Sequence, residues 1–105
     1  MAQFDLHGNT NPGTLGRTPF LLDVQSDATS VLPTRLVCPV RRGSLMSGEP
    51  IDQVHFTVTI NMETFVVFVT ELTAVPTAVL GPVVTSLKSH RQEIVSAIDL
   101  LITGF

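Results

Sequence analysis

Three histidines and one cysteine are the side chains of this sequence best suited to metal binding or nucleophilic catalysis. His7, His55 and His90 lie far apart, and none has another histidine, cysteine or carboxylate at metal-ligand spacing. Cys38 lies among apolar residues of an expected strand, as a small core side chain does. We therefore predict structural or solvent-facing roles for all four residues, with no metal site and no cofactor.

No other pattern indicates catalysis. The sequence has no glycine-rich phosphate loop, no nucleophile elbow and no paired-carboxylate motif. Asp23 and Asp27 are four residues apart at an expected strand end, where capping of a loop accounts for them as well as acid–base chemistry does. The six basic residues are scattered over a chain of net charge −3, which disfavours direct binding to nucleic acid. We expect a protein that binds rather than catalyses.

The composition predicts one small, mainly β domain over residues 1–105. Val, Ile and Thr supply 32 of the 105 residues, and β-branched side chains favour strands. The chain is 44% hydrophobic and 14% charged, more apolar than a single core of this size needs. We therefore expect leftover apolar surface and a homodimer or an obligate partner.

The location is expected to be cytoplasmic. A single cysteine cannot form a disulfide within the chain, which is typical of a reducing compartment. The longest apolar run, Phe65–Val69, is far shorter than the ~20 residues that span a bilayer. No charged and then apolar leader opens the sequence, so neither secretion nor a membrane partner is expected.

Alternating and apolar runs predict the strands. Three short strands are expected early in the chain, and Pro39 indicates an edge position or a bulge in the third. Asn61 and Met62 mark the turn of a hairpin between two later strands, the second of which is apolar on both faces and so central or at a subunit contact. Residues 72–82 hold two prolines and predict a short strand and a turn. The expected strands are Gln3–His7, Pro19–Val24, Arg35–Val40, Val54–Ile60 and Phe65–Val69, with loops at 8–18 and 41–52.

The C-terminal residues predict a helix. Ser89 and Gln92 form a capping-box pattern at its start. One stripe of the helix is apolar and is expected to pack on the core: Ile94, Ile98, Leu101 and Phe105. The opposite stripe is polar: Gln92, Ser96, Asp99 and Thr103. This polar stripe is either a solvated face or a docking face, and the periodicity alone does not separate the two.

Several segments resemble the CcdB family of toxins from bacterial plasmid-maintenance modules. The resemblance spans essentially the whole chain and is loosest between residues 41 and 65. It rests on Gln3-Phe4, on Leu22–Asp27 followed by Thr34–Val40, and on a C-terminal series of Val75–Gly81, Leu87, Ser89–Arg91, Ile94, Ala97–Leu100 and Gly104-Phe105.

The resemblance implies an SH3-like β-barrel with a small appended sheet and one C-terminal helix, forming a homodimer. It also implies a function without catalysis, in which the dimer binds the A subunit of DNA gyrase and traps the enzyme on cleaved DNA. An antitoxin neutralises such toxins through a disordered C-terminal segment. The complex of the two represses its own operon, so DNA is contacted only through that complex.

The resemblance also implies which residues contact gyrase. They are the end of the chain, the polar stripe and two residues of an early loop: Gln92, Ser96, Asp99, Thr103, Gly104, Phe105, Ala28 and Thr29. The family's best-known member has a tryptophan anchor at the position of Thr103 and often two bulky aliphatics at the positions of Ala28 and Thr29.

Two alternatives stay open at this stage. The same barrel carries endoribonuclease toxins of the MazF type, for which Arg17 and Arg35 are the candidate residues here, although the charge disfavours RNA binding. The other alternative is a homologue that has lost poisoning and is retained for antitoxin binding and regulation. It is considered because the aromatic anchor is missing.

Overall fold

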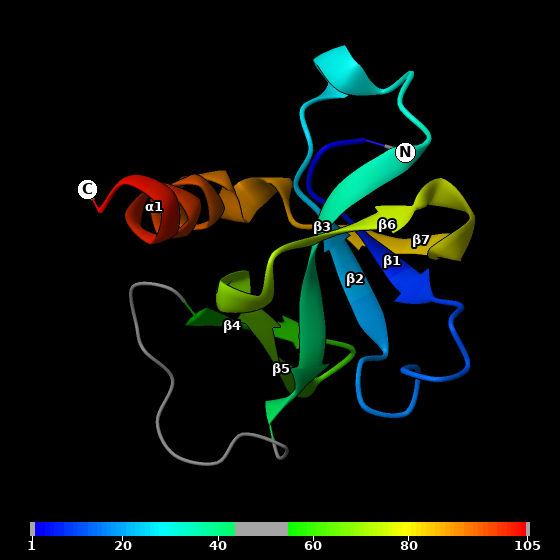
Figure 1. Cartoon of the computed structure of the whole chain (residues 1–105). Coiled ribbons are helices and arrows are strands. Elements are labelled where there is room, and N and C mark those ends of the chain that lie inside the picture. Colours follow the sequence, from blue (N-terminus) through cyan, green and yellow to red (C-terminus); the bar gives the residue numbers. More distant parts are fainter. Residues whose placement is uncertain (1, 44–54, 105) are drawn as a thin grey trace.

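The computed structural model describes residues 2–43 and 55–104, and in them the chain folds as a curled half-barrel sheet with one C-terminal helix (Figure 1). The strands are β1 Asp5–Asn9, β2 Phe20–Asp23, β3 Thr34–Arg42, β4 His55–Ile60, β5 Glu63–Phe68, β6 Thr73–Pro76 and β7 Leu80–Ser86. Short 3₁₀ turns are η1 Asp27–Thr29, η3 Val69–Glu71, η4 Thr77–Val79 and η5 Lys88–His90, and the helix α1 is Arg91–Thr103. The predicted mainly β fold with a C-terminal helix is confirmed.

The long strand β3 organises the sheet, whose order is β4-β5-β3-β2-β1-β7. One edge of β3 pairs with β2, and the other is shared by β6 at residues 34–37 and β5 at residues 40–42. On this edge Pro39 lies between the residues that pair with β6 and those that pair with β5. No hydrogen bond of the sheet is lost there through the N–H that proline lacks. Of the two readings of Pro39, an edge position or a bulge, the edge position is wrong, because β3 lies inside the sheet and the proline needs only this local gap between partners.

The predicted hairpin is confirmed where the structure describes it. β4 and β5 pair from His55↔Phe68 to Ile60↔Glu63, and the two turn residues Asn61 and Met62 both have positive φ, 51° and 68°. Two such residues form the turn that matches the twist of paired strands. β5 is central, between β4 and β3, as its apolar faces predict. Val54 and most of the expected 41–52 loop lie outside the described residues, and β3 continues to Arg42.

The first and the last strand differ most from the prediction. β1 is shifted to Asp5–Asn9, because Asn9 donates from its backbone N–H to the Pro19 carbonyl and from its amide to the Thr18 carbonyl. β7 was not predicted, since Gly81 and Pro82 read as a turn. It pairs with β1 at the end of the sheet, where Pro82 is tolerated. A Cβ on Gly81 would lie 2.9 Å from the Gly8 carbonyl oxygen, so the glycine permits the close approach of the two strands.

The core lies between the sheet and α1. Leu6, Leu22, Cys38 and Val40 from β1, β2 and β3 pack with Ile94 of the helix, and all five are completely buried. Ala97 is buried beside them and Ile98 is half-buried. The predicted apolar stripe is thus confirmed in its first half only.

The start of the helix differs from the predicted capping box. α1 begins at Arg91 after the η5 turn, and its N-cap residue His90 makes no side-chain cap hydrogen bond. The Ser86 hydroxyl instead accepts from the Lys88 N–H ahead of η5, and His90 Nδ1 lies 3.1 Å from Glu93 Oε1. The Ser89 capping prediction is therefore wrong, because a 3₁₀ turn takes up the three residues before the helix.

Candidate functional site: the outward face of the C-terminal helix

The polar stripe of α1 faces away from the core. Gln92, Ser96, Asp99 and Thr103 are all exposed, while Ile94 and Ala97 on the opposite side are buried. Successive residues of a helix are about 100° apart, which places the four polar side chains within one narrow sector. The structure therefore brings these four predicted site residues together on one accessible surface.

The end of the helix is fixed by two short-range hydrogen bonds. The Thr103 hydroxyl donates to the Asp99 carbonyl at 2.7 Å, and the Gly104 N–H donates to the Leu100 carbonyl at 3.1 Å. Gly104 has a φ of +80°, the left-handed conformation that ends many helices and favours glycine. Thr103 thus serves to cap the last turn, and Gly104 sets the direction in which the chain leaves it. Phe105, the remaining predicted contact at this end, lies outside the described residues.

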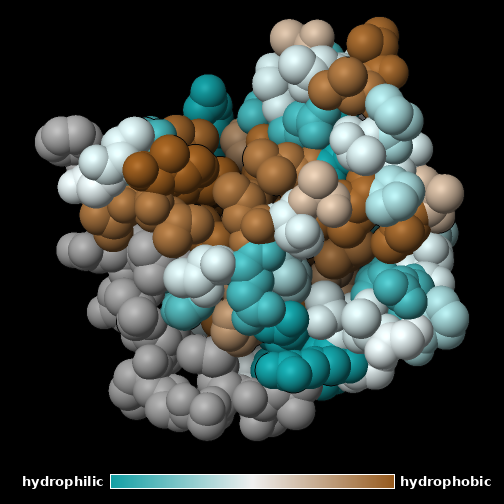
Figure 2. Space-filling model, viewed as in Figure 1, coloured by the Kyte–Doolittle hydropathy of each residue, from teal (hydrophilic) through white to brown (hydrophobic). Residues whose placement is uncertain are grey.

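Two aliphatic side chains are exposed on the last turn of the helix, Leu101 opposite the polar stripe and Ile102 next to it. Leu101 and Ile102 are 41% and 67% exposed, so the predicted core position of Leu101 is wrong. The core ends before the last turn of α1, which extends beyond the sheet (Figure 1). Figure 2 shows apolar side chains gathered over α1 and continuing across the middle of this face of the molecule. The leftover apolar surface expected from the composition is present on this face.

Ala28 and Thr29 lie on the η1 turn, which Figure 1 shows well apart from the C-terminal end of α1. Both are exposed. The Gln25 amide donates to the carbonyl and hydroxyl oxygens of Thr29, and the Thr29 hydroxyl donates to the Ser26 carbonyl. A single chain therefore holds the early-loop residues in a defined shape but does not bring them to the polar stripe.

The most exposed aliphatic side chains near η1 are two residues that were not predicted. Val31 is 91% exposed and Leu32 is 48% exposed. They follow the two small residues at which the family often has bulky aliphatics. The sequence shows them as an aliphatic pair between polar residues and Pro33. They were missed because the segment was expected to be a loop, where an aliphatic pair indicates no particular role.

A buried ion pair holds the chain segment that leads into the η1 turn. Arg35 donates to Asp23 from Nε at 2.9 Å and from Nη2 at 2.8 Å, and Nη2 also donates to the Gln25 carbonyl at 3.1 Å. The side chains of Arg35 and Asp23 are 1% and 0% exposed. Arg35 is thus committed to the structure, and of the two residues named for RNA cleavage only Arg17 is exposed.

The three histidines contact neighbouring residues of the fold, and Cys38 is buried in the core. His7 is buried, with Nδ1 2.9 Å from the Gly81 carbonyl oxygen, and His55 Nε2 lies 2.9 Å from the Thr70 hydroxyl. His90 is stacked against Phe56 beside its Glu93 contact. Burial raises the pKa of the Cys38 thiol to about 12, so it is protonated at neutral pH. Among residues 2–43 and 55–104, no three His, Cys, Asp or Glu side chains are arranged to hold a metal ion.

Comparison with known proteins gives two findings. A family model described as CcdB protein matches residues 3–104. A solved structure described as an endoribonuclease in complex with its cognate antitoxin, from mycobacterial species, is similar with a TM-score of 0.73 and 9% identity, over 97% of this chain and 94% of that one. At that identity the likeness concerns the fold. Separately, no helix in the described part of the chain is long and apolar enough to cross a membrane.

Proposed function

Because the chain belongs to the CcdB family, we propose that it is the toxin of a type II toxin–antitoxin pair that binds the A subunit of DNA gyrase. In this proposal it traps gyrase on cleaved DNA and has no catalytic activity of its own. The observation that carries the proposal is the exposed polar stripe of α1, which runs into a glycine-terminated helix end and has the exposed Ile102 next to it.

The chemistry of this surface fits a protein partner. The centre of a protein interface needs apolar side chains to bury, and its rim needs polar groups that can bond or stay wet. Ile102 supplies the first, while Gln92, Ser96 and Asp99 supply the second. Because the Thr103 hydroxyl already donates to the Asp99 carbonyl, the proposal assigns the apolar contact to the neighbouring Ile102 rather than to Thr103.

A homodimer is part of the proposal. The apolar surface that continues across the middle of the face in Figure 2 is what a second copy of the chain would cover. In a symmetric dimer each protomer presents one α1 end and one η1 turn, so residues that one chain keeps apart can contribute to a shared surface. Sedimentation equilibrium should give twice the 11.3 kDa of the chain.

The remaining parts of the proposal concern the antitoxin and the cell. We assign the chain a cognate antitoxin, supported by the family and by the solved neighbour whose description names one. The proposal includes neutralisation by a disordered antitoxin segment, repression of the shared operon by the complex, and a cytoplasmic location, where gyrase acts.

Blocking the polar stripe tests the proposal. Ser96→Tyr places a bulky ring in the middle of the stripe, and Thr59→Tyr places the same ring on the exposed face of β4. Binding to purified gyrase A subunit, measured by calorimetry, should weaken about tenfold or more for Ser96→Tyr and stay unchanged for Thr59→Tyr. Equal binding by the two variants, or no binding by the unaltered protein, would refute the assignment of this face.

Two parallel controls address the alternatives. RNA degraded by the purified protein would favour the endoribonuclease, although the burial of Arg35 removes one of its two candidate residues. Antitoxin binding without any binding to gyrase would identify the non-poisoning homologue.

A further inference from the structure

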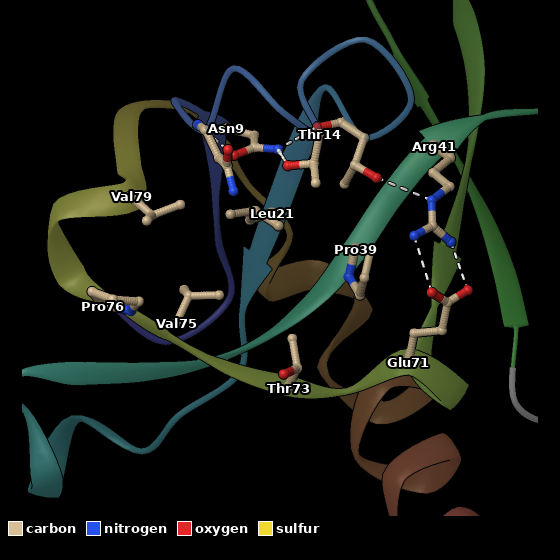
Figure 3. A pocket seen from close by; sticks show the side chains of 12 residues that line it. Asn9, Thr14, Leu21, Pro39, Arg41, Glu71, Thr73, Val75, Pro76 and Val79 are labelled. Atoms are coloured by element: carbon tan, nitrogen blue, oxygen red, sulfur yellow. Dashed lines mark hydrogen bonds and ion pairs between the residues drawn. The ribbon is translucent and has the colours of Figure 1, made fainter.

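A pocket of about 420 Å³ lies on the face of the sheet that points away from α1 (Figure 3). Leu22 and Cys38 pack in the core beneath the helix, so their chain neighbours Leu21 and Pro39 point to the other face, where they line the pocket. Leu21 and Pro39 are paired across β2 and β3. We call this cavity the β2–β3 pocket. Its volume is within the range of sites that bind small molecules.

One side of the β2–β3 pocket is aliphatic. Val75 and Val79 come from β6 and η4, and Figure 3 shows them pointing toward Leu21. None of the lining residues that the structure describes is aromatic. This side therefore suits a short aliphatic chain and offers no ring on which a flat ligand could stack. Its members are Leu21, Pro39, Val75, Pro76 and Val79.

The loop between β1 and β2 forms a wall whose shape is fixed by Asn9. The Asn9 amide donates to the Thr14 hydroxyl at 2.9 Å and to the Thr18 carbonyl at 2.8 Å, and its Oδ1 accepts from the Asn11 N–H at 3.0 Å. Asn9 is buried while it makes these three bonds. Binding of a ligand would therefore require little ordering of this wall, which favours affinity.

Thr18 brings a buried hydroxyl to the same wall. The residue is only 5% exposed, and its hydroxyl accepts from Arg41 Nε at 3.0 Å. Because Thr18 and Arg41 both line the pocket, the hydroxyl lies at the pocket. Within residues 2–43 and 55–104 this hydroxyl donates to no acceptor. A buried donor without an acceptor is unfavourable, and an oxygen atom of a ligand would supply the acceptor.

The charges at the pocket are already paired with each other. Arg41 and Glu71 are the two charged residues among the described lining residues. Arg41 donates to both carboxylate oxygens of Glu71, from Nη1 at 2.6 Å and from Nη2 at 3.0 Å. The pair has no net charge and offers no counter-ion to a ligand. A charged ligand would lose water there without gaining an opposite charge, so the pocket favours a neutral one.

We infer that the β2–β3 pocket binds a small neutral molecule with a short aliphatic chain and a carbonyl group. The carbonyl oxygen accepts from the Thr18 hydroxyl, and the chain lies on the aliphatic side. Primary amides of short fatty acids are the simplest members of this class. The inference goes beyond the proposed function, because it concerns the face of the sheet that points away from α1 and needs no macromolecular partner.

Titration of the isotope-labelled whole protein, followed by amide chemical shifts in nitrogen–proton correlation spectra, tests the class of ligand. Hexanamide should bind saturably and shift the amides of the lining residues. It should bind roughly tenfold more tightly than butanamide, because two more CH₂ groups are buried. It should also bind roughly tenfold more tightly than hexanoate or hexylammonium, which have the same number of carbon atoms and a charge.

Two kinds of variant test the place of binding. Thr73→Tyr fills the pocket at an exposed position of β6, and Thr59→Tyr places the same ring at an exposed position of β4 as the control. The affinity for hexanamide should fall about tenfold for Thr73→Tyr and stay unchanged for Thr59→Tyr. Far-UV circular dichroism and melting temperatures establish that each variant is folded.

The Thr18 hydroxyl is tested by Thr18→Val, which keeps the shape of the side chain, and by Thr18→Ser, which keeps the hydroxyl. Thr18→Val should weaken both amides by about fivefold and leave the ratio between them unchanged, because the chain contacts remain. Thr18→Ser should bind both amides as the unaltered protein does. The pair Thr73→Tyr and Thr59→Tyr keeps the test decisive if Thr18→Val does not fold.

Four outcomes would overturn the inference. They are no saturable binding of hexanamide, equal or tighter binding of either charged compound, full affinity in Thr73→Tyr, and equal affinity of folded Thr18→Val and Thr18→Ser. The titration contains no gyrase, so its result stands apart from the proposed function. Failure to bind the gyrase A subunit would leave the pocket assignment intact, and failure to bind hexanamide would leave the proposed function intact.

Discussion

The buried Asp23–Arg35 pair should be the largest single electrostatic determinant of stability described in this fold. Asp23 accepts from Arg35 at 2.9 Å and 2.8 Å and from the Gln25 N–H at 3.0 Å, with almost no exposure of either charged group. Asp23→Ala would leave the Arg35 guanidinium buried without its counter-ion. Breaking such a pair typically costs 3–5 kcal/mol, out of roughly 5–15 kcal/mol for a domain of this size.

Urea unfolding followed by far-UV circular dichroism is the appropriate assay, because the chain has no Trp or Tyr for fluorescence. With a slope of about 1.5 kcal/mol per molar urea, the midpoint should fall by roughly 2–3 M. All samples should have the same protein concentration, because the stability of a dimer depends on it.

A surface pair provides the control. Arg42 and Glu63 are 3.1 Å apart but about half exposed, so Glu63→Ala should cost at most about 1 kcal/mol. The double variant Asp23→Leu/Arg35→Met removes both buried charges and should be more stable than Asp23→Ala. Equal midpoints for Asp23→Ala and Glu63→Ala would refute the reasoning.

Three further outcomes are expected. The buried Cys38, with its pKa near 12, should react with Ellman's reagent at pH 8 only on unfolding, and rapid reaction of the folded protein would contradict this. Gly104→Ala should lower the free energy of unfolding in urea by about 1–2 kcal/mol, because residue 104 has a left-handed φ. An unchanged midpoint would contradict that conformation at the end of the helix. The Arg41 hydrogen bonds lower the pKa of Glu71, so their stabilisation is present above the ordinary glutamate range and is lost as the pH falls through the lowered value. Carbon-13 titration of the Glu71 carboxyl should show its pKa rising in Arg41→Met, and an unshifted pKa would contradict the assignment.

The parts of the fold governed by local periodicity could be predicted from the sequence. The alternation through residues 55–60 and the Asn61-Met62 turn predicted the hairpin, and the spacing of Ile94 and Ile98 predicted the buried side of α1. The polar stripe followed from the same helical period.

Features governed by contacts between distant segments could not be predicted in this way. β7 contains Gly81 and Pro82, which signal a turn until the close approach to Gly8 is known. The capping prediction failed because a 3₁₀ turn precedes α1. The pocket lined by Asn9, Arg41 and Glu71 was missed because these three residues come from separate elements and have no common spacing. Leu101 was misplaced because the period of a helix does not tell where the core beneath it ends.

Cleavage of supercoiled plasmid by gyrase in the presence of ATP tests the central claim most directly. The intact protein should produce linear DNA, and a chain lacking Gly104 and Phe105 should produce at most a trace at the same concentration. No linear DNA with the intact, folded protein, or equal amounts with both chains, would contradict poisoning of gyrase through the end of α1.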